Sequence, residues 1–264
     1  MTHIKIPPDH PRAESLQLRE RLIERHLEGI VAVSGLIAHG RGEAFDYLLG
    51  EKTSKPALEA ISATAAMLLT AEKPVISVNG NTAALVAEEV VKLADVTGSK
   101  IEVNLFYRSP ERELAIEKLL RKAGAREVFG TGRKASAKIP ELSSERRCVD
   151  PRGILVADVV MVPLEDGDRT EALVKMGKRV IAIDLNPLSR TAQKATITIV
   201  DNIVRSAPKL VETAEKLKKQ DPKKRVEILR KYDNKKNLAG SIILIEENLS
   251  KLATQSGQTT KEGK

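Results

Sequence analysis

Short apolar segments rich in Val and Ile alternate with amphipathic segments from residue 74 to residue 219. The apolar segments carry hydrophobic side chains on both faces, as parallel strands do when helices cover both sides of their sheet. This alternation predicts an α/β fold with a Rossmann-like parallel sheet core, because each parallel strand needs a crossover to reach the next. Strands are expected at 74–81, 101–108, 127–130, 157–163, 179–185 and 195–201, and helices at 82–96, 110–123, 168–177 and 203–219.

Helical segments are expected on both sides of this core. Thr53 or Ser54 is suited to cap a helix over 53–71, and Pro56 fits its first turn. A second amphipathic pattern covers 12–28, and two more follow the core at 222–231 and 236–253. The predicted parts are an N-terminal helical layer packed on the core (1–73), the Rossmann-like core (74–219), a C-terminal helical extension (220–253) and a disordered polar tail (254–264).

Cysteine usage and hydropathy narrow the class of protein. The single cysteine, Cys148, excludes an internal disulfide framework and a zinc site built from several cysteines. No apolar run approaches the roughly 20 residues that span a bilayer, and the first residues lack the apolar core of a signal peptide. The sequence therefore predicts a cytoplasmic protein that does not bind membranes.

The positive net charge is confined to one segment. Residues 205–236 hold 12 Lys and Arg against 5 Asp and Glu, which accounts for nearly all of the formal charge of +8. Proteins that bind single strands stack the bases on aromatic side chains, and aromatic residues make up only 2% of this chain. We therefore interpret the segment as a solvated basic helix and expect no nucleic-acid partner.

Polar side chains follow five of the expected strands. Ligands of open parallel sheets bind outside the carboxyl ends of the strands, so these residues predict a small-molecule site at that edge. Any one cluster is also compatible with a plain turn, whereas five clusters at one edge favour a site. They are Asn79, Gly80 and Asn81; Asn104, Tyr107 and Arg108; Glu165, Asp166, Asp168 and Arg169; Asp184, Asn186, Ser189 and Arg190; and Asp201 and Asn202.

The segment VIAIDLNPLSRTA (180–192) has the residues of an adenosine site. An acidic residue that ends an apolar strand, here Asp184, can accept hydrogen bonds from both ribose hydroxyls. Asn186 could bind the adenine edge, and Ser189 and Arg190 start a helix whose N–H groups favour an anion. Neither a GxGxxG nor a GxxxxGK[ST] motif is present, so the chain lacks the standard dinucleotide and P-loop signatures.

Glycines and charged residues interrupt the apolar segment GLIAHGRGEAFDYLLGE (35–51). Gly40 and Gly42 would let the backbone turn sharply or approach a ligand. Arg41 between them is a candidate ligand of a phosphate or carboxylate. His39 is compatible with a donor, a base or a packed imidazole, so both side chains are candidates for catalysis.

Metal and nucleophile motifs are less informative. The four histidines have no metal-ligand spacing, and Cys148 has no evident partner base, so it is interpreted as an incidental thiol. The loop EDGDR (165–169) could hold Mg²⁺ through one or two carboxylates or could cap the next helix, and the sequence leaves both open.

Six segments together resemble the archaeal phosphopantothenate synthetases, also called 4-phosphopantoate–β-alanine ligases. The resemblance covers about residues 4–215 and is carried by long, specific motifs, among them GLIAHGRGEAFDYLLGE and DLNPLSRTA. The segments are 6–20, 35–51, 74–81, 102–108, 163–192 and 197–203.

The resemblance implies an AMP-forming ligation in coenzyme A biosynthesis by a homodimer with a Rossmann-like core. ATP and 4-phosphopantoate would form an acyl-adenylate, which β-alanine attacks to give phosphopantothenate and AMP; such chemistry suits Arg and Mg²⁺. The implied ATP contacts are Arg19, Arg41, Asp184, Leu185, Asn186, Ser189, Arg190, Asp201 and Asn202. Their location at strand ends makes Asn79, Asn81, Asn104 and Arg108 candidates for 4-phosphopantoate.

Two other functions are compatible with parts of the sequence. A dinucleotide-dependent oxidoreductase would share the fold class, but the glycine signature is absent. A nucleic-acid-binding protein would use the basic residues 205–236, but the charge is local and aromatic residues are scarce.

Overall fold

The computed structural model describes residues 6–7, 9–140 and 142–259. Five parallel strands form the central sheet in the order β2–β1–β5–β6–β7. This confirms the predicted α/β class with a Rossmann-like core. The strands are β1 (Pro74–Val78), β2 (Lys100–Val103), β5 (Val159–Pro163), β6 (Arg179–Ile183) and β7 (Ile197–Ile199).

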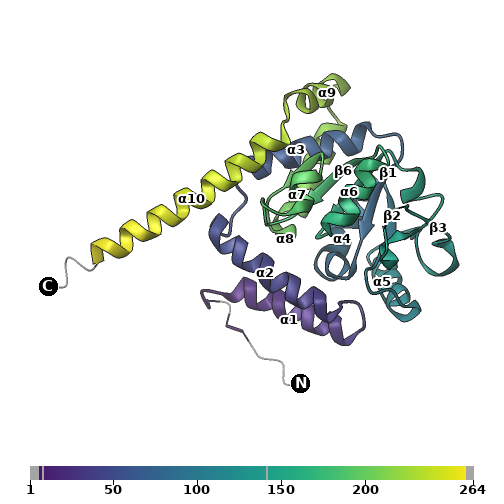
Figure 1. Cartoon of the computed structure of the whole chain (residues 1–264), viewed down its shortest axis with the longest axis horizontal. Helices are drawn as coiled ribbons and strands as arrows, with labels where there is room; N and C mark the ends of the chain where they lie inside the picture. The colour runs from purple at the N-terminus through teal and green to yellow at the C-terminus, as the bar shows by residue number, and fades with distance from the viewer. Residues whose placement is uncertain (1–5, 8, 141, 260–264) are drawn as a thin grey trace.

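Helices cover both faces of the sheet, as Figure 1 shows. Alternate side chains of a strand point to opposite faces, so Val159 and Met161 pack in the larger hydrophobic cluster while Val160 and Val162 pack in the smaller one. The helices of the core are α3 (Lys55–Thr70), α4 (Gly80–Thr97), α5 (Pro110–Lys122), α6 (Gly167–Lys175), α7 (Arg190–Lys194) and α8 (Ile203–Lys218).

The N-terminal helices divide into two groups. Ser54 caps α3 by accepting a hydrogen bond from the Ala57 N–H at 3.2 Å, as the sequence predicts, and α3 packs on α8 and β7 as part of the core. Only α1 (Ala13–Leu27) and α2 (Val33–Leu49) form a separate layer, which lies along one side of the molecule (Figure 1).

The segment predicted as the third strand is reduced to one residue. Phe129 forms an isolated parallel bridge with Glu102, and Gly130 follows it with a φ of +75°. Because this left-handed conformation is incompatible with a strand, the prediction of a strand over 127–130 is wrong. In the described residues of the irregular region after it, a two-stranded ribbon, β3 (Ala137–Lys138) and β4 (Cys148–Val149), and three short 3₁₀ turns are present.

Two helices end the chain, α9 (Pro222–Lys231) and α10 (Asn234–Thr259), and α10 extends away from the body (Figure 1). The prediction of disorder from residue 254 is wrong for 254–259, which continue α10. No proline interrupts this stretch, and extending an existing helix is far less costly than starting one. Residues 260–264 lie outside the described residues.

The order of the strands positions the functional site. The chain runs outward from β1 to β2 and then returns to place β5 on the other side of β1. Open α/β sheets bind ligands at such a switch point, beyond the carboxyl ends of the two strands. Within the described residues, no helix is long and apolar enough to cross a membrane.

Candidate functional site

Two adjoining cavities lie at the switch point between β1 and β5. The first has a volume of about 400 Å³ and lies between α2 and the segments that follow β5 and β6. The second, of about 250 Å³, lies between the start of α2, the start of α4 and the segment after β2. Both cavities are lined by Ala38, Arg41, Asn81, Leu164 and Asp166, which we call the junction.

The segment after β6 forms one wall of the first cavity. Asp184 accepts hydrogen bonds from the Asn186 N–H at 2.9 Å and from the Ser189 hydroxyl. The Ser189 oxygen in turn accepts from the Ala192 N–H at 2.9 Å and so caps α7. Burial raises the pKa of Asp184, against the opposing effect of these hydrogen bonds. The turn is thus rigid before a ligand arrives.

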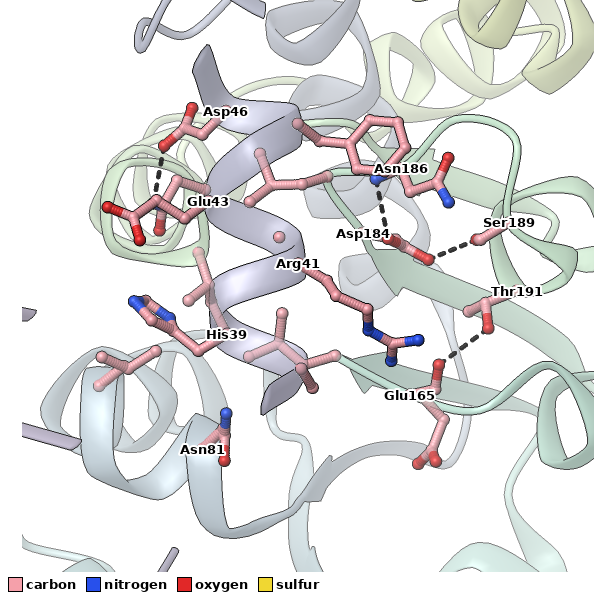
Figure 2. Close-up of a pocket in the computed structure, with 18 of the residues that line it drawn as sticks. His39, Arg41, Glu43, Asp46, Asn81, Glu165, Asp184, Asn186, Ser189 and Thr191 are labelled. Carbon is pink, nitrogen blue, oxygen red and sulfur yellow. Dashed lines mark hydrogen bonds between the residues drawn. The ribbon is translucent and has the colours of Figure 1, made fainter. Parts of the chain in front are cut away.

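Helix α2 forms the opposite wall and carries both predicted catalytic residues. It runs without a break through Gly40 and Gly42, so the predicted sharp turn is wrong. At Gly42 an added Cβ would lie 3.4 Å from the Leu185 side chain, so α2 packs closely on the segment after β6, and approach to a ligand stays a prediction. Arg41 extends toward Asp184, whereas His39 points to the other side of the helix (Figure 2). Residues two apart on a helix do not share a face.

Buried ion pairs fasten the end of α2 to the start of α8. Asp46 of α2 accepts hydrogen bonds from the Asn202 amide at 2.9 Å and from Arg205 Nη1 at 3.0 Å. Arg205 also contacts Asp201 at 2.8 Å, and Asp201 accepts a hydrogen bond from Thr53. Burial raises the pKa of Asp201 despite the charge of Arg205. Neither Asp46 nor Arg205 was predicted as a site residue from the sequence; the i,i+4 spacing of Asp201 and Arg205 is the one local signal of a pair.

A second ion pair lies at the α1 side of the first cavity. Arg19 makes three hydrogen bonds of 2.7–3.0 Å to Glu43, which lines the cavity. The Tyr47 hydroxyl donates to the same carboxylate at 2.7 Å. Beside this group, burial lowers the pKa of His39, so its imidazole is neutral near pH 7.

Beneath the junction, Glu165 joins two arginines. Its side chain is 1% exposed and lies 2.9 Å from Arg146 Nε. It also accepts a hydrogen bond from Arg169, which is equally buried and donates to Ser77 at 3.0 Å. Asp166 stands at the N-cap of α6 but makes no side-chain cap. It contacts Arg146 at 2.8 Å.

The four predicted substrate residues separate into two pairs. Asn79 and Asn81 line the second cavity, although Asn79 also caps α4 and donates to the Pro163 carbonyl at 3.0 Å. Asn104 and Arg108 line neither cavity. Both donate to the Cys148 carbonyl, at 3.1 and 3.2 Å. These contacts attach the segment around Cys148 to the end of β2, and a contact of Asn104 or Arg108 with substrate stays a prediction.

Most of the predicted nucleotide residues come together. Arg19 and Asp201 do not line the first cavity, but each is paired with a residue beside it. No group of three or more His, Cys, Asp or Glu that could hold a metal ion occurs among the described residues. The predicted residues that line the first cavity are Arg41, Asp184, Leu185, Asn186, Ser189, Arg190 and Asn202.

Comparison with known proteins places this arrangement in a family. The family model for phosphopantothenate/pantothenate synthetase matches residues 56–248. The chain belongs to this family. Proteins named 4-phosphopantoate–β-alanine ligase resemble it along almost their whole length. The one from Thermococcus onnurineus is 54% identical over 250 residues, 95% of each chain. The one from Methanosarcina mazei is 52% identical over 252 residues, 96% of this chain and 98% of the relative.

Proposed function

We propose that this chain ligates 4-phosphopantoate and β-alanine to 4′-phosphopantothenate in coenzyme A biosynthesis, using ATP and releasing AMP and pyrophosphate. Family membership and the names of the relatives support the reaction. The observation that carries it is the pair of cavities that share Arg41. A ligase that forms an acyl-adenylate must hold a nucleotide and an acid side by side, with a cation where the carboxylate meets the α-phosphate.

The first cavity is the proposed ATP site. Asp184 can accept hydrogen bonds from the ribose hydroxyls, and the amide of Asn186 can bind adenine. Ser189 and Arg190 lie at the start of α7. The N–H groups of that helix and the guanidinium of Arg190 can bind the phosphates. The remaining proposed contacts are Leu185 and Asn202, which line the cavity, and Arg19 and Asp201, which act through Glu43 and Arg205.

Asp166 is the proposed carboxylate for Mg²⁺. It lies at the junction, half of its side chain is exposed, and it is not used as a cap. Mg²⁺ in such enzymes takes one or two carboxylates together with substrate phosphates, which fits a site without a metal cluster. The ion would neutralise charge on the phosphates of ATP.

Each half-reaction then has a proposed residue. In the first, a carboxylate oxygen of the acid attacks the α-phosphorus, the bond to pyrophosphate breaks, and Arg41 stabilises the charge that develops. In the second, the amine of β-alanine attacks the acyl carbon, the bond to AMP breaks, and His39 accepts the proton. A neutral imidazole can accept this proton, and His39 lines the first cavity together with Arg41.

A homodimer is the proposed assembly. Ile242 and Leu249 are 40% and 48% exposed and lie two turns apart on one face of α10, while Ile245 packs against the body of the protein. Exposed apolar stripes on an extended helix are typical of association surfaces. Analytical ultracentrifugation should show a dimer that Leu249→Glu weakens and Lys251→Ala does not; a wild-type monomer at micromolar concentration would contradict the proposal.

The reaction itself can be tested directly. Purified protein with ATP, Mg²⁺, 4-phosphopantoate and β-alanine should release AMP and pyrophosphate, with little ADP. Without β-alanine, 4-phosphopantoate alone should support pyrophosphate–ATP exchange, because the adenylate forms reversibly. ADP and phosphate as products would replace the adenylate with an acyl phosphate, and no turnover of the acid would contradict the proposed function.

A further inference from the structure

Arg112 lines the second cavity with a charge that no carboxylate balances. It lies in the first turn of α5, where it donates to the Ile30 carbonyl at 3.0 Å and to the Tyr107 carbonyl. Among the described residues it forms no ion pair, and its buried Nε–H has no acceptor. Each terminal nitrogen donates to one carbonyl and carries a second N–H, so the guanidinium keeps donors for a ligand in the cavity.

Arg146 brings a second guanidinium to the same cavity. It is 7% exposed and is held from behind by Glu165 and Asp166, at 2.9 and 2.8 Å. Burial lowers the pKa of Arg112, and the charge of Arg146 lowers it further. The two cations are therefore close enough to repel each other, and an anion between them would relieve that repulsion.

The charges around the second cavity favour an anion over a neutral ligand. Arg41, Arg112 and Arg146 line it, against the single carboxylate of Asp166. The remaining wall includes apolar side chains after β2, where Phe106 and Tyr107 form an edge-to-face pair with ring centres 5.0 Å apart. The cavity thus combines a basic end with an apolar wall.

We propose that Arg112 and Arg146 bind the phosphate monoester of the acyl substrate and make the enzyme select the phosphorylated acid. The assignment rests on the proposed function. A phosphate monoester carries a charge of about −1.5 to −2 and three strong acceptor oxygens, which a planar guanidinium can contact in pairs. The acid would then lie across the second cavity with its carboxylate at the junction, beside Arg41, and its geminal methyl groups against the apolar wall.

The test compares 4-phosphopantoate with pantoate, which lacks the phosphate. In the wild type, kcat/KM should be much higher for 4-phosphopantoate. Arg112→Gln should lower kcat/KM for 4-phosphopantoate on the order of tenfold to a hundredfold. The variant should leave kcat/KM for pantoate and the KM for ATP unchanged. Arg112→Lys keeps the charge but lacks the planar guanidinium. Its kcat/KM for 4-phosphopantoate should lie between those of the wild type and Arg112→Gln. Arg121→Gln is the matched control, because Arg121 is on the same helix, pairs with Glu117 and lines neither cavity.

A binding measurement covers the case in which Arg112→Gln does not fold. With a non-hydrolysable ATP analogue at saturation, wild-type protein should bind inorganic phosphate by calorimetry, and 4-phosphopantoate should compete with it whereas pantoate should not. Equal losses for both acids, no loss for either, or phosphate binding that pantoate displaces equally well would each overturn the assignment. If the wild type turns over neither acid, the proposed function fails instead, which is a distinguishable result.

Discussion

The two cavities differ in how their charges are balanced. Carboxylates outnumber arginines around the first cavity, yet several of them are already paired: Glu43 with Arg19, and Asp46 with Arg205. Around the second cavity arginines outnumber carboxylates, and Arg112 has no carboxylate partner among the described residues. The first cavity can therefore bind an anionic nucleotide, because several of its carboxylates are neutralised by arginines. The second cavity has an excess of positive charge that an anionic ligand would balance.

The difference also separates rigid from ligand-dependent parts of the site. The first cavity has its turn after β6 and its helix α2 fixed by internal hydrogen bonds and ion pairs. In the second, the terminal nitrogens of Arg112 make one hydrogen bond each, to the Tyr107 and Ile30 carbonyls, and keep further N–H donors. We infer that the nucleotide half is pre-organised and that the acid half gains its last interactions on binding.

Arg41 lines both cavities, so its substitution tests whether the difference between them extends to the reacting centre. Arg41→Ala should lower kcat/KM on the order of a thousandfold, for the acid and for ATP alike, since it removes the charge at the reacting centre. The side chain is exposed, so the melting temperature should stay unchanged. Steady-state kinetics with each substrate varied, beside a thermal melt, measure both effects. A lower melting temperature with normal turnover per folded molecule would make Arg41 structural.

His39 lines only the first cavity, so its removal should affect one half-reaction. His39→Gln should lower kcat for ligation on the order of a hundredfold while pyrophosphate–ATP exchange persists. Because burial lowers the pKa of His39 below its ordinary value, wild-type kcat should rise with pH to a plateau whose inflection lies below pH 6.5. The variant should lack that inflection.

Two results would contradict this role for His39. If the variant loses exchange and ligation equally, the side chain acts on adenylation or on folding. If it keeps the acid limb of the pH profile, another group carries the proton. Glu43→Gln is a second probe, because the charge of Glu43 raises the pKa of His39 and its loss should move the inflection to a lower pH.

The sequence predicted the sheet better than the site. Apolar strands are local patterns, so five of the six expected strands are present in the structure. The residues after β6 were correctly predicted to lie at the carboxyl edge of the sheet, because parallel strands end at one edge. The expected strand at 127–130 failed where Gly130 takes a positive φ, which the apolar pattern does not encode.

The ion pairs around the cavities could not be predicted from the sequence. Asp46 and Arg205 are 159 positions apart, and nothing in either local segment indicates the other. For the same reason the sequence predicts that Asn104 and Arg108 follow a strand, but not that both donate to the Cys148 carbonyl, which is a tertiary contact. Arg112 lies in an ordinary amphipathic helix, and only the fold shows that its charge faces a cavity.

The smallest effect, and the sharpest test of the first cavity alone, is expected at Asp184. Asp184→Asn keeps the size of the side chain but replaces one accepting oxygen with a donor, so one ribose hydrogen bond is lost. The KM for ATP should rise about tenfold, with the KM for 4-phosphopantoate unchanged. Equal changes in both KM values would show that the two cavities do not bind independently.

The pH dependence of ATP binding shows whether the effect of Asp184→Asn arises from the lost ribose contact. Burial raises the pKa of Asp184 above its ordinary value, so on acidification this carboxyl takes up a proton earlier than an exposed aspartate would. The protonated carboxyl resembles the amide, because each has one accepting oxygen and one donor. ATP binding by the wild type should therefore weaken toward that of Asp184→Asn as the pH falls, and the two should differ most above neutrality. Calorimetric titrations of ATP at several pH values measure this convergence; a difference that stays constant with pH would mean that the substitution acts through the turn held by Asn186 and Ser189, not through the ribose.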